Sequence, residues 1–192
     1  MRVSREQAAQ NRGRVVDTAA KLFRERGFNG VGVADLMKAA GMTHGAFYGQ
    51  FESKEDLMAQ SCARAYQGLL ELWRDAAEHA PDDPLASVVA SYMSASHRDK
   101  PGEGCVVAAL GAEAAREGAA LRRVMTEGIR TQIDMLSGMV RGSSKATKRQ
   151  RAAVTFASMV GAMVLARVLD DEALSKGILR AVKIEASDSR GS

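Results

Sequence analysis

The sequence has few aromatic residues, few prolines and few cysteines, and each scarcity excludes a class of protein. Aromatic residues make up 5% of the chain, whereas alanine, leucine and methionine are plentiful, which favours helices over a β-rich fold. Cys62 and Cys105 lie far apart and lack metal-ligand spacing. We therefore expect an all-α protein with free thiols and no disulfide scaffold.

Long apolar runs are also missing. We find no uninterrupted apolar stretch that approaches the roughly 20 residues needed to cross a bilayer. The first residues, MRVSREQAAQNRGR, are polar and lack the apolar segment of a signal peptide. We expect a cytoplasmic protein with no membrane partner.

The motifs of common enzymes are absent as well. His44, His79 and His97 are too scattered for a metal site, and H-E-x-x-H, G-x-S-x-G and P-loop patterns do not occur. The GVG at 30–32 does not extend to a dinucleotide fingerprint. We expect neither metal nor cofactor and no catalytic residue. A helical small-molecule carrier or enzyme without specific DNA binding is the alternative from another class.

The net charge of +4 is concentrated at the amino end. Residues 1–54 hold nine Lys or Arg and five acids, whereas residues 55–192 hold 18 of each sign. A basic head beside a neutral body is the pattern of a polyanion-binding protein. A solvated basic surface explains the charge alone equally well.

Residues 32–51, GVADLMKAAGMTHGAFYGQF, have the layout of a helix-turn-helix. We expect helices over about 33–40 and 44–50, with the turn at Gly41. Such a motif places its second helix in the major groove of DNA. Apolar periodicity and turn residues predict further helices over about 4–26, 53–78, 84–98, 105–116, 119–140, 147–169 and 172–186.

The segment GFNGVGVADLMKAAGMTHGAFYGQFESKEDL resembles the N-terminal domain of the TetR/AcrR family of transcriptional regulators. The similarity covers about residues 12–63 and includes AAKLFRERGF at 19–28. It implies a three-helix DNA-binding head, residues 1–54, on a helical ligand-binding and dimerisation domain, residues 55–192, with about nine helices in all. It also implies a homodimer that binds double-stranded operator DNA and releases it when a small-molecule effector enters the body.

Two positions depart from the family pattern. Gly32 stands where Ser or Thr is frequent, and Gln50 stands where His is frequent. A glycine can occupy a helix N-cap but offers no side-chain oxygen. Both departures bear on which DNA is bound rather than on the fold.

Small residues dominate the second helix of the motif. Gly45, Ala46 and Gly49 would let the backbone approach bases and phosphates closely, or they simply make a weak helix. Thr43 is expected to cap this helix, and the resemblance implies that it also touches a phosphate.

Larger side chains supply the other candidate DNA contacts. The Tyr48 hydroxyl can reach a phosphate, unless the ring is partly buried. Lys54 begins a helix, where a positive charge opposes the helix dipole, so a phosphate partner is indicated. His44 and Gln50 are candidates for base edges, and Gln50 suits a phosphate equally well.

The helix over 147–169 is apolar nearly all round, as expected for a helix buried on two sides. Burial within one subunit explains this pattern, and the resemblance favours a dimer interface with the last helix. The predicted interface residues are Phe156, Val160, Met163, Val164, Leu174, Ile178 and Val182.

Aromatic and methionine side chains in the body are candidates for an effector pocket, although most of them can equally be ordinary core. The expected ligand is apolar or aromatic. The candidate residues are Tyr66, Trp73, Tyr92, Met93, Cys105, Met125, Ile129, Phe156 and Met159.

Cys105 begins a predicted helix, where a thiol has a lowered pKa and greater reactivity. This placement predicts a redox- or electrophile-sensing regulator as an alternative mode of control. The competing interpretation is a small buried apolar residue.

Overall fold

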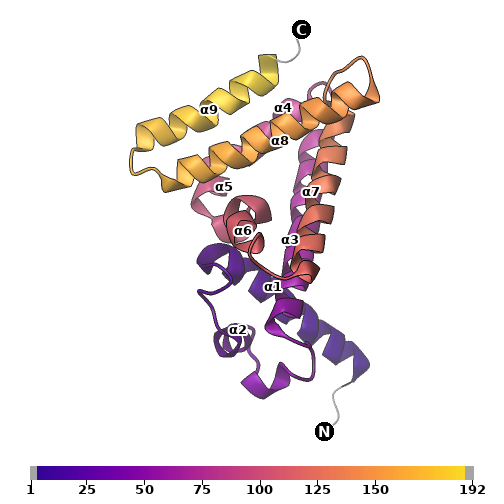
Figure 1. The fold of residues 1–192 in the computed structure, drawn as a ribbon, viewed down its shortest axis with the longest axis vertical. Helices are drawn as coiled ribbons and strands as arrows, with labels where there is room; N and C mark the ends of the chain where they lie inside the picture. Colours follow the sequence, from indigo (N-terminus) through magenta and orange to yellow (C-terminus); the bar gives the residue numbers. More distant parts are fainter. Residues whose placement is uncertain (1–3, 189–192) are drawn as a thin grey trace.

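The computed structural model describes residues 4–188, and the elements in this range are helices joined by turns, which confirms the all-α fold class. A small head lies at one end and a longer helical body rises from it (Figure 1). Helices α8 and α9 run across the far end of the body, away from the head (Figure 1).

The head contains α1 (Arg5–Arg26), α2 (Val33–Ala39), the 3₁₀ turn η1 (His44–Ala46) and the first turns of α3 (Lys54–Glu78). Phe23, Leu36 and Phe47 are buried at its centre. α1 ends at Gly27, whose φ of 78° is a conformation that other residues rarely adopt. α3 starts at Ser53, whose hydroxyl accepts the N–H of Asp56 at 3.0 Å.

The body is built from the rest of α3 and from α4 (Pro84–Tyr92), α5 (Ala95–Asp99), η2 (Pro101–Glu103), α6 (Val106–Ala114), α7 (Ala119–Met139), α8 (Lys145–Val168) and α9 (Glu172–Asp188). The single helix predicted over 84–98 is wrong. The chain breaks at Met93, and Ser94 starts α5 by accepting the N–H of His97 at 3.1 Å. A serine N-cap inside a continuous apolar pattern is the signal that we missed.

Buried side chains form two clusters along the molecule. The lower cluster joins the head to α6 and the start of α7, and includes Phe23, Phe47 and Leu110. The upper cluster fills the body and includes Trp73 and Phe156. α3 contributes to both, so one helix connects the head core to the body core.

α8 corrects the expectation that no apolar stretch reaches bilayer length. It has 24 residues, with a mean hydropathy of 1.4 over its most apolar window, and is long and apolar enough to span a membrane by length and composition. Its apolar character has a local explanation. Met159 and Met163 are buried in the upper cluster, while Val154, Leu165 and Val168 on other faces of the helix are exposed.

Candidate nucleic-acid interface

The turn between α2 and the following segment depends on Gly41. Its φ is 73°, and its N–H donates to the carbonyl of Lys38 at 3.0 Å. The N–H of Met42 then donates to the carbonyl of Met37 at 2.8 Å. Both bonds satisfy carbonyls at the end of α2, and the left-handed conformation between them favours glycine. The predicted turn is confirmed.

The segment after the turn, which we call the recognition segment (residues 44–50), is not the predicted α-helix. Only residues 44–46 form a 3₁₀ turn, and the N–H of Phe47 donates to the carbonyl of His44 at 3.1 Å. Gly45 and Gly49 lower the helix propensity of a stretch that is already short. The segment is instead held by Phe47, whose ring stacks on Phe51 at 5.5 Å.

Open space surrounds the small residues of the recognition segment. A Cβ at Gly45 would have no atom within 4 Å, and one at Gly49 would meet only the carbonyl of Ala46 at 3.9 Å. Packing within this subunit therefore does not require glycine at either position. The backbone is open to close approach by another molecule.

Tyr48 projects from the recognition segment with 73% of its surface exposed, so the alternative of a partly buried ring is wrong. Its ring touches Phe47 and His44 edge-on, with centroids 5.4 Å and 5.8 Å away. These contacts orient the ring. The hydroxyl is available for a partner outside the subunit.

Thr43 is at the N-cap position, but its side chain makes no capping bond, contrary to our prediction. The reason is the tight turn, in which the N–H of Ala46 already donates to the Thr43 backbone carbonyl at 3.1 Å. The exposed Thr43 side chain is therefore not needed to start the turn.

Gln50 folds back over the recognition segment, and this conformation does not present it to a base edge. Its Nε2 donates to the carbonyl of Ala46 at 3.1 Å, and its Oε1 is buried without a partner. The Gln50 N–H bonds to Phe47 instead of Ala46. The side-chain amide thus replaces the helical bond that the Ala46 carbonyl lacks.

Lys54 has a partner inside the head. Its Nζ donates to the carbonyl of Phe28 at 2.6 Å, which ties the start of α3 to the loop after α1. We had inferred an external phosphate because the charge opposes the helix dipole. A loop carbonyl that needs a donor explains the lysine without DNA.

Arg12 of α1 was not among our candidates, yet it braces the recognition segment. Its guanidinium lies 4.6 Å from the centre of the Phe51 ring, donates to the carbonyl of Gln50, and reaches Gln60 Oε1 at 2.9 Å. In the sequence, the signal for this role is that Arg12 lies one turn before Val15, on the apolar face of α1. Arg12 therefore holds the end of the recognition segment in place.

Besides the apolar packing of the lower cluster, two hydrogen-bonded contacts join the head to the body beyond α3. Arg24 of α1 donates to the carbonyl of Gly102 in η2, with Nε 3.0 Å away. Glu113 of α6 accepts the N–H of Phe28 at 2.8 Å. Burial lowers the pKa of Arg24. Movement of η2 or α6 is therefore transmitted directly to both ends of the 24–28 stretch.

His97 fixes the conformation of the segment from Tyr92 to Cys105, which contains η2. Its Nδ1 is 2.6 Å from the carbonyl of Tyr92, and its Nε2 accepts the N–H of Cys105 at 2.8 Å. This pair of bonds requires a neutral ring with the proton on Nδ1. Burial lowers the pKa of His97 to about 4, in agreement with the neutral form.

We expect this histidine to make the protein less stable in mild acid. The pKa of His97 is about 4 in the fold against an ordinary value of 6.5, so between these values the unfolded chain binds more protons. Stability then falls as pH drops, by about 2 kcal/mol for this group at pH 5. Urea unfolding at pH 7 and pH 5 measures the difference. His97→Gln should flatten the dependence and the exposed His79→Asn should not; equal slopes in both variants would refute the assignment.

Cys105 corrects another expectation. It lies at the N-cap of α6, but it is fully buried, and burial raises its pKa. The loss of water outweighs the helix terminus. The structure therefore removes the physical reason for expecting an activated thiol.

The predicted pocket residues do not form one set. Tyr66 and Met125 lie in the lower cluster, with the Tyr66 hydroxyl 3.5 Å from the Met125 sulfur. Trp73 lies in the upper cluster, and its ring centroid is 6.0 Å from that of Tyr92 and 6.3 Å from that of Phe156. The upper cluster contains Trp73, Tyr92, Met93, Cys105, Phe156 and Met159, with half-buried Ile129 against it. Their role as ligand contacts stays a prediction.

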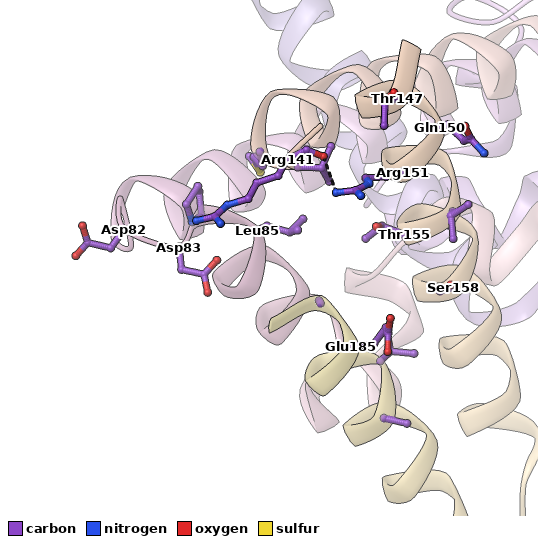
Figure 2. A pocket seen from close by; sticks show the side chains of 17 residues that line it. Asp82, Asp83, Leu85, Arg141, Thr147, Gln150, Arg151, Thr155, Ser158 and Glu185 are labelled. Atoms are coloured by element: carbon purple, nitrogen blue, oxygen red, sulfur yellow. Dashed lines mark hydrogen bonds between the residues drawn. The ribbon is translucent and has the colours of Figure 1, made fainter. Parts of the chain in front are cut away.

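A separate groove of about 870 Å³ opens on the surface (Figure 2). It lies between the end of α7, the first half of α8, the end of α9 and the start of α4. Arg151 donates to the carbonyl of Arg141 at one wall, at 3.2 Å (Figure 2). None of the predicted pocket residues lines this groove.

The predicted dimer residues divide between two faces. Phe156 and Met163 are buried in the upper cluster, so they cannot meet a partner, and their assignment is wrong. Val164 and Leu174 are exposed, while Val160, Ile178 and Val182 are half-buried. A helix that is apolar all round does not reveal which face points inward. The exposed apolar side chains that we missed on these helices are Val154, Leu165, Val168 and Ile184.

The helical head, with its glycine turn and exposed recognition segment, defines a regulator of the helix-turn-helix class. A family model described as bacterial regulatory proteins of the tetR family matches residues 15–60. Residues 15–60 thus form a TetR-family domain, and the comparisons support a TetR family transcriptional regulator. This family consists of DNA-binding regulators, which are not enzymes.

Curated relatives agree with this assignment. The HTH-type transcriptional regulator AcrR of Shigella flexneri is 31% identical over 85 residues, which cover 44% of this chain and 40% of AcrR. The HTH-type transcriptional repressor NemR of Escherichia coli K12 is 27% identical over 168 residues, which cover 82% of this chain and 84% of NemR. The chain thus matches less than half the length of AcrR.

Solved structures share the fold over nearly the whole chain. The reduced form of E. coli NemR superposes with a TM-score of 0.78 at 23% identity, covering 93% of this chain and 96% of that one. A TetR-family regulator from Cytophaga hutchinsonii has a TM-score of 0.79 at 19% identity, covering 97% of each chain.

Proposed function

We propose that this chain is a ligand-responsive repressor that binds one operator sequence in double-stranded DNA as a homodimer. Residues 1–54 bind DNA, and residues 55–192 dimerise and bind a small apolar or aromatic effector that releases the operator. The protein acts in the cytoplasm, without cofactor or membrane partner. The observation that carries the proposal is the exposed recognition segment, with Tyr48 projecting and the backbone open at Gly45.

Each candidate residue of the head has a distinct role in this proposal. Gly45 and Ala46 let the backbone approach the groove, and His44 reads a base edge. Thr43 and Tyr48 donate hydroxyl hydrogens to phosphates, which position the head without reading sequence. Gln50 and Lys54 act indirectly, by shaping the recognition segment and its link to α1.

A dimer supplies the affinity that one short segment lacks. Two heads related by a two-fold axis would contact half-sites about one helical turn, roughly 34 Å, apart. The exposed apolar residues of α8 and α9 provide a self-complementary surface far from the heads (Figure 1). An effector shifts the head spacing only to the extent that it prefers one arrangement of the body.

Selection of bound duplexes from random DNA tests the proposal. We expect two similar half-sites in inverted orientation, with affinity falling steeply as salt rises because phosphate contacts release counterions. Equal binding to every duplex at physiological salt would contradict it and favour a carrier without specific DNA binding.

Tyr48→Phe should weaken operator binding about three- to tenfold, since one phosphate hydrogen bond is lost. The loss should be similar for operator and random DNA, because a phosphate contact carries no sequence information. Fluorescence anisotropy with labelled duplexes measures both affinities. Ser91→Ala is the control, since Ser91 carries an exposed hydroxyl on α4, outside the head, and its loss should leave DNA affinity unchanged. Unchanged affinity in Tyr48→Phe would remove the phosphate role.

A further inference from the structure

Five hydrogen-bond donors in the described part of the body are buried without a nitrogen or oxygen partner, and three of them lie in one neighbourhood. These three are Nε1 of Trp73, Nη1 of Arg167 and the hydroxyl of Tyr92, which interacts with the buried thiol of Cys105. The other two are Oγ of Ser61 and Nε2 of Gln132. Buried polar atoms in proteins are nearly always paired, so a group of unpaired donors requires an explanation. Burying these atoms away from water lowers the stability of the fold.

The three donors belong to one neighbourhood of the upper cluster. The rings of Trp73 and Tyr92 lie 6.0 Å apart, and the Tyr92 ring lies 4.3 Å from the His97 ring. Arg167 donates to the backbone carbonyls of His97 at 2.7 Å and Arg98 at 3.1 Å. These bonds fix two of its nitrogens and leave Nη1 unpaired.

This neighbourhood is electropositive. Burial lowers the pKa of Arg167, and the groups that interact with its charge are Tyr92 and Cys105. Burial raises the pKa of both, so both are neutral at pH 7. His97 is neutral as well, with a pKa of about 4. The arginine therefore has no anionic partner among these interior groups.

On the outer side of Arg167, three acidic residues line a surface hollow of about 280 Å³. Asp99 pairs with Arg98 at 2.7 Å, and Glu172 pairs with Lys176 at 2.6 Å. Asp170 is the third acid of this hollow. Arg167 itself lines this hollow and is half-buried.

Apolar side chains complete the surroundings of the donors. Phe156 lies 6.3 Å from Trp73 between ring centroids, and Met93 and Met159 are buried in the same cluster. Methionine side chains are flexible and can move to admit a ligand. The neighbourhood thus combines donors and one cation with an adaptable apolar wall.

We infer that Trp73, Tyr92 and Arg167 bind the carboxylate of an amphiphilic organic acid, whose aryl or alkyl part lies against Phe156 and the methionines. A carboxylate only accepts hydrogen bonds and has about four lone-pair sites, which suits a set of donors beside one guanidinium. This inference rests on the proposed function, because the acid would be the effector.

Trp73 is the single tryptophan of the chain, so its fluorescence reports on the site directly. We would titrate the full-length protein with 3-phenylpropionate and with 3-phenylpropionamide, which has the same body and a neutral head. Straight-chain alkanoates from six to ten carbons cover longer ligands. We expect at least one acid to change Trp73 emission and to bind about tenfold or more tighter than its amide.

Three variants test the contacts. Arg167→Met should reduce the preference for the acid over its amide to within about twofold, and Tyr92→Phe should weaken acid binding about three- to tenfold. Arg123→Met, on the exposed face of α7, is the matched control and should bind the acid like the parent. If Arg167→Met does not fold, as judged by circular dichroism, the inference is tested by Tyr92→Phe and by the parent protein's preference for the acid over its amide.

Equal binding of acids and amides by the parent, or no response to any acid at millimolar concentration, would overturn the inference. Retention of the full preference in every folded variant at Arg167 and Tyr92 would do the same. Operator affinity without ligand is measured in parallel. A parent that binds its operator but no acid refutes only the ligand class, whereas one that binds the acid but no operator refutes the proposed function.

Discussion

The double variant Leu165→Glu, Val168→Glu should be a folded monomer whose operator affinity is at least about 100-fold below that of the parent. Both side chains lie on α8, with 54% and 78% of their surfaces exposed. Two carboxylates on an apolar subunit interface are costly to bury and repel their symmetry mates. A monomer loses the second half-site, and with it most of the binding free energy.

Light scattering on the purified variant gives its mass, and anisotropy titration gives its affinity. Leu72→Glu is the matched control, because Leu72 of α3 is 55% exposed and lies outside α8 and α9. This control should stay dimeric and bind DNA like the parent. A double variant that remains dimeric would place the interface elsewhere.

Arg12→Met should destabilise the head by about 2–3 kcal/mol, because a charged hydrogen-bond donor and a cation–π contact are lost together. Operator affinity should also fall more than about tenfold. The reason is that its guanidinium holds the Gln50 carbonyl and the Phe51 ring, which end the recognition segment. Thermal unfolding and anisotropy measure the two effects.

The exposed pair of Arg64 with Asp17, at 2.7 Å, provides the control for Arg12. Arg64→Met removes an arginine from the surface, where ion pairs contribute about 0–1 kcal/mol. It should change stability little and leave DNA binding intact. If Arg12→Met behaves in the same way, the bracing role is refuted.

Local backbone rules made the head predictable up to a point. The turn at Gly41 follows from its own conformational freedom, and the structure has it there with φ of 73°. The length of the second helix does not follow from such a rule. Gly45 and Gly49 weaken it, and the packing of Phe47 on Phe51 decides how much of it forms.

Side-chain partners were the least predictable part. Lys54 bonds to Phe28, 26 residues earlier, and Arg12 bonds to Gln50, 38 residues later. Nothing in the local sequence indicates such partners, because the tertiary fold brings them together. In the sequence alone, Lys54 therefore resembles a cation without a partner in the protein, and no local pattern indicates the partners of Arg12.

Helical periodicity also has a limit on α8. When every side of a helix is apolar, the 3.6-residue repeat marks no inward face. The interface prediction for this helix included Phe156 and Met163 beside Val160 and Val164, but the core buries Phe156 and Met163. The smaller side chains of Val154 and Val168 are exposed on the surface of the subunit.

The unbroken course of α3 from head to body has a mechanical consequence. Its 25 residues, Lys54–Glu78, make a rod of about 37 Å, at about 1.5 Å per residue. Pivoting such a rod by about 5° swings its tip by about 3 Å, close to the rise of one base pair along a strand. A conformational change too small to disrupt the packed core can therefore move both heads out of register with their half-sites.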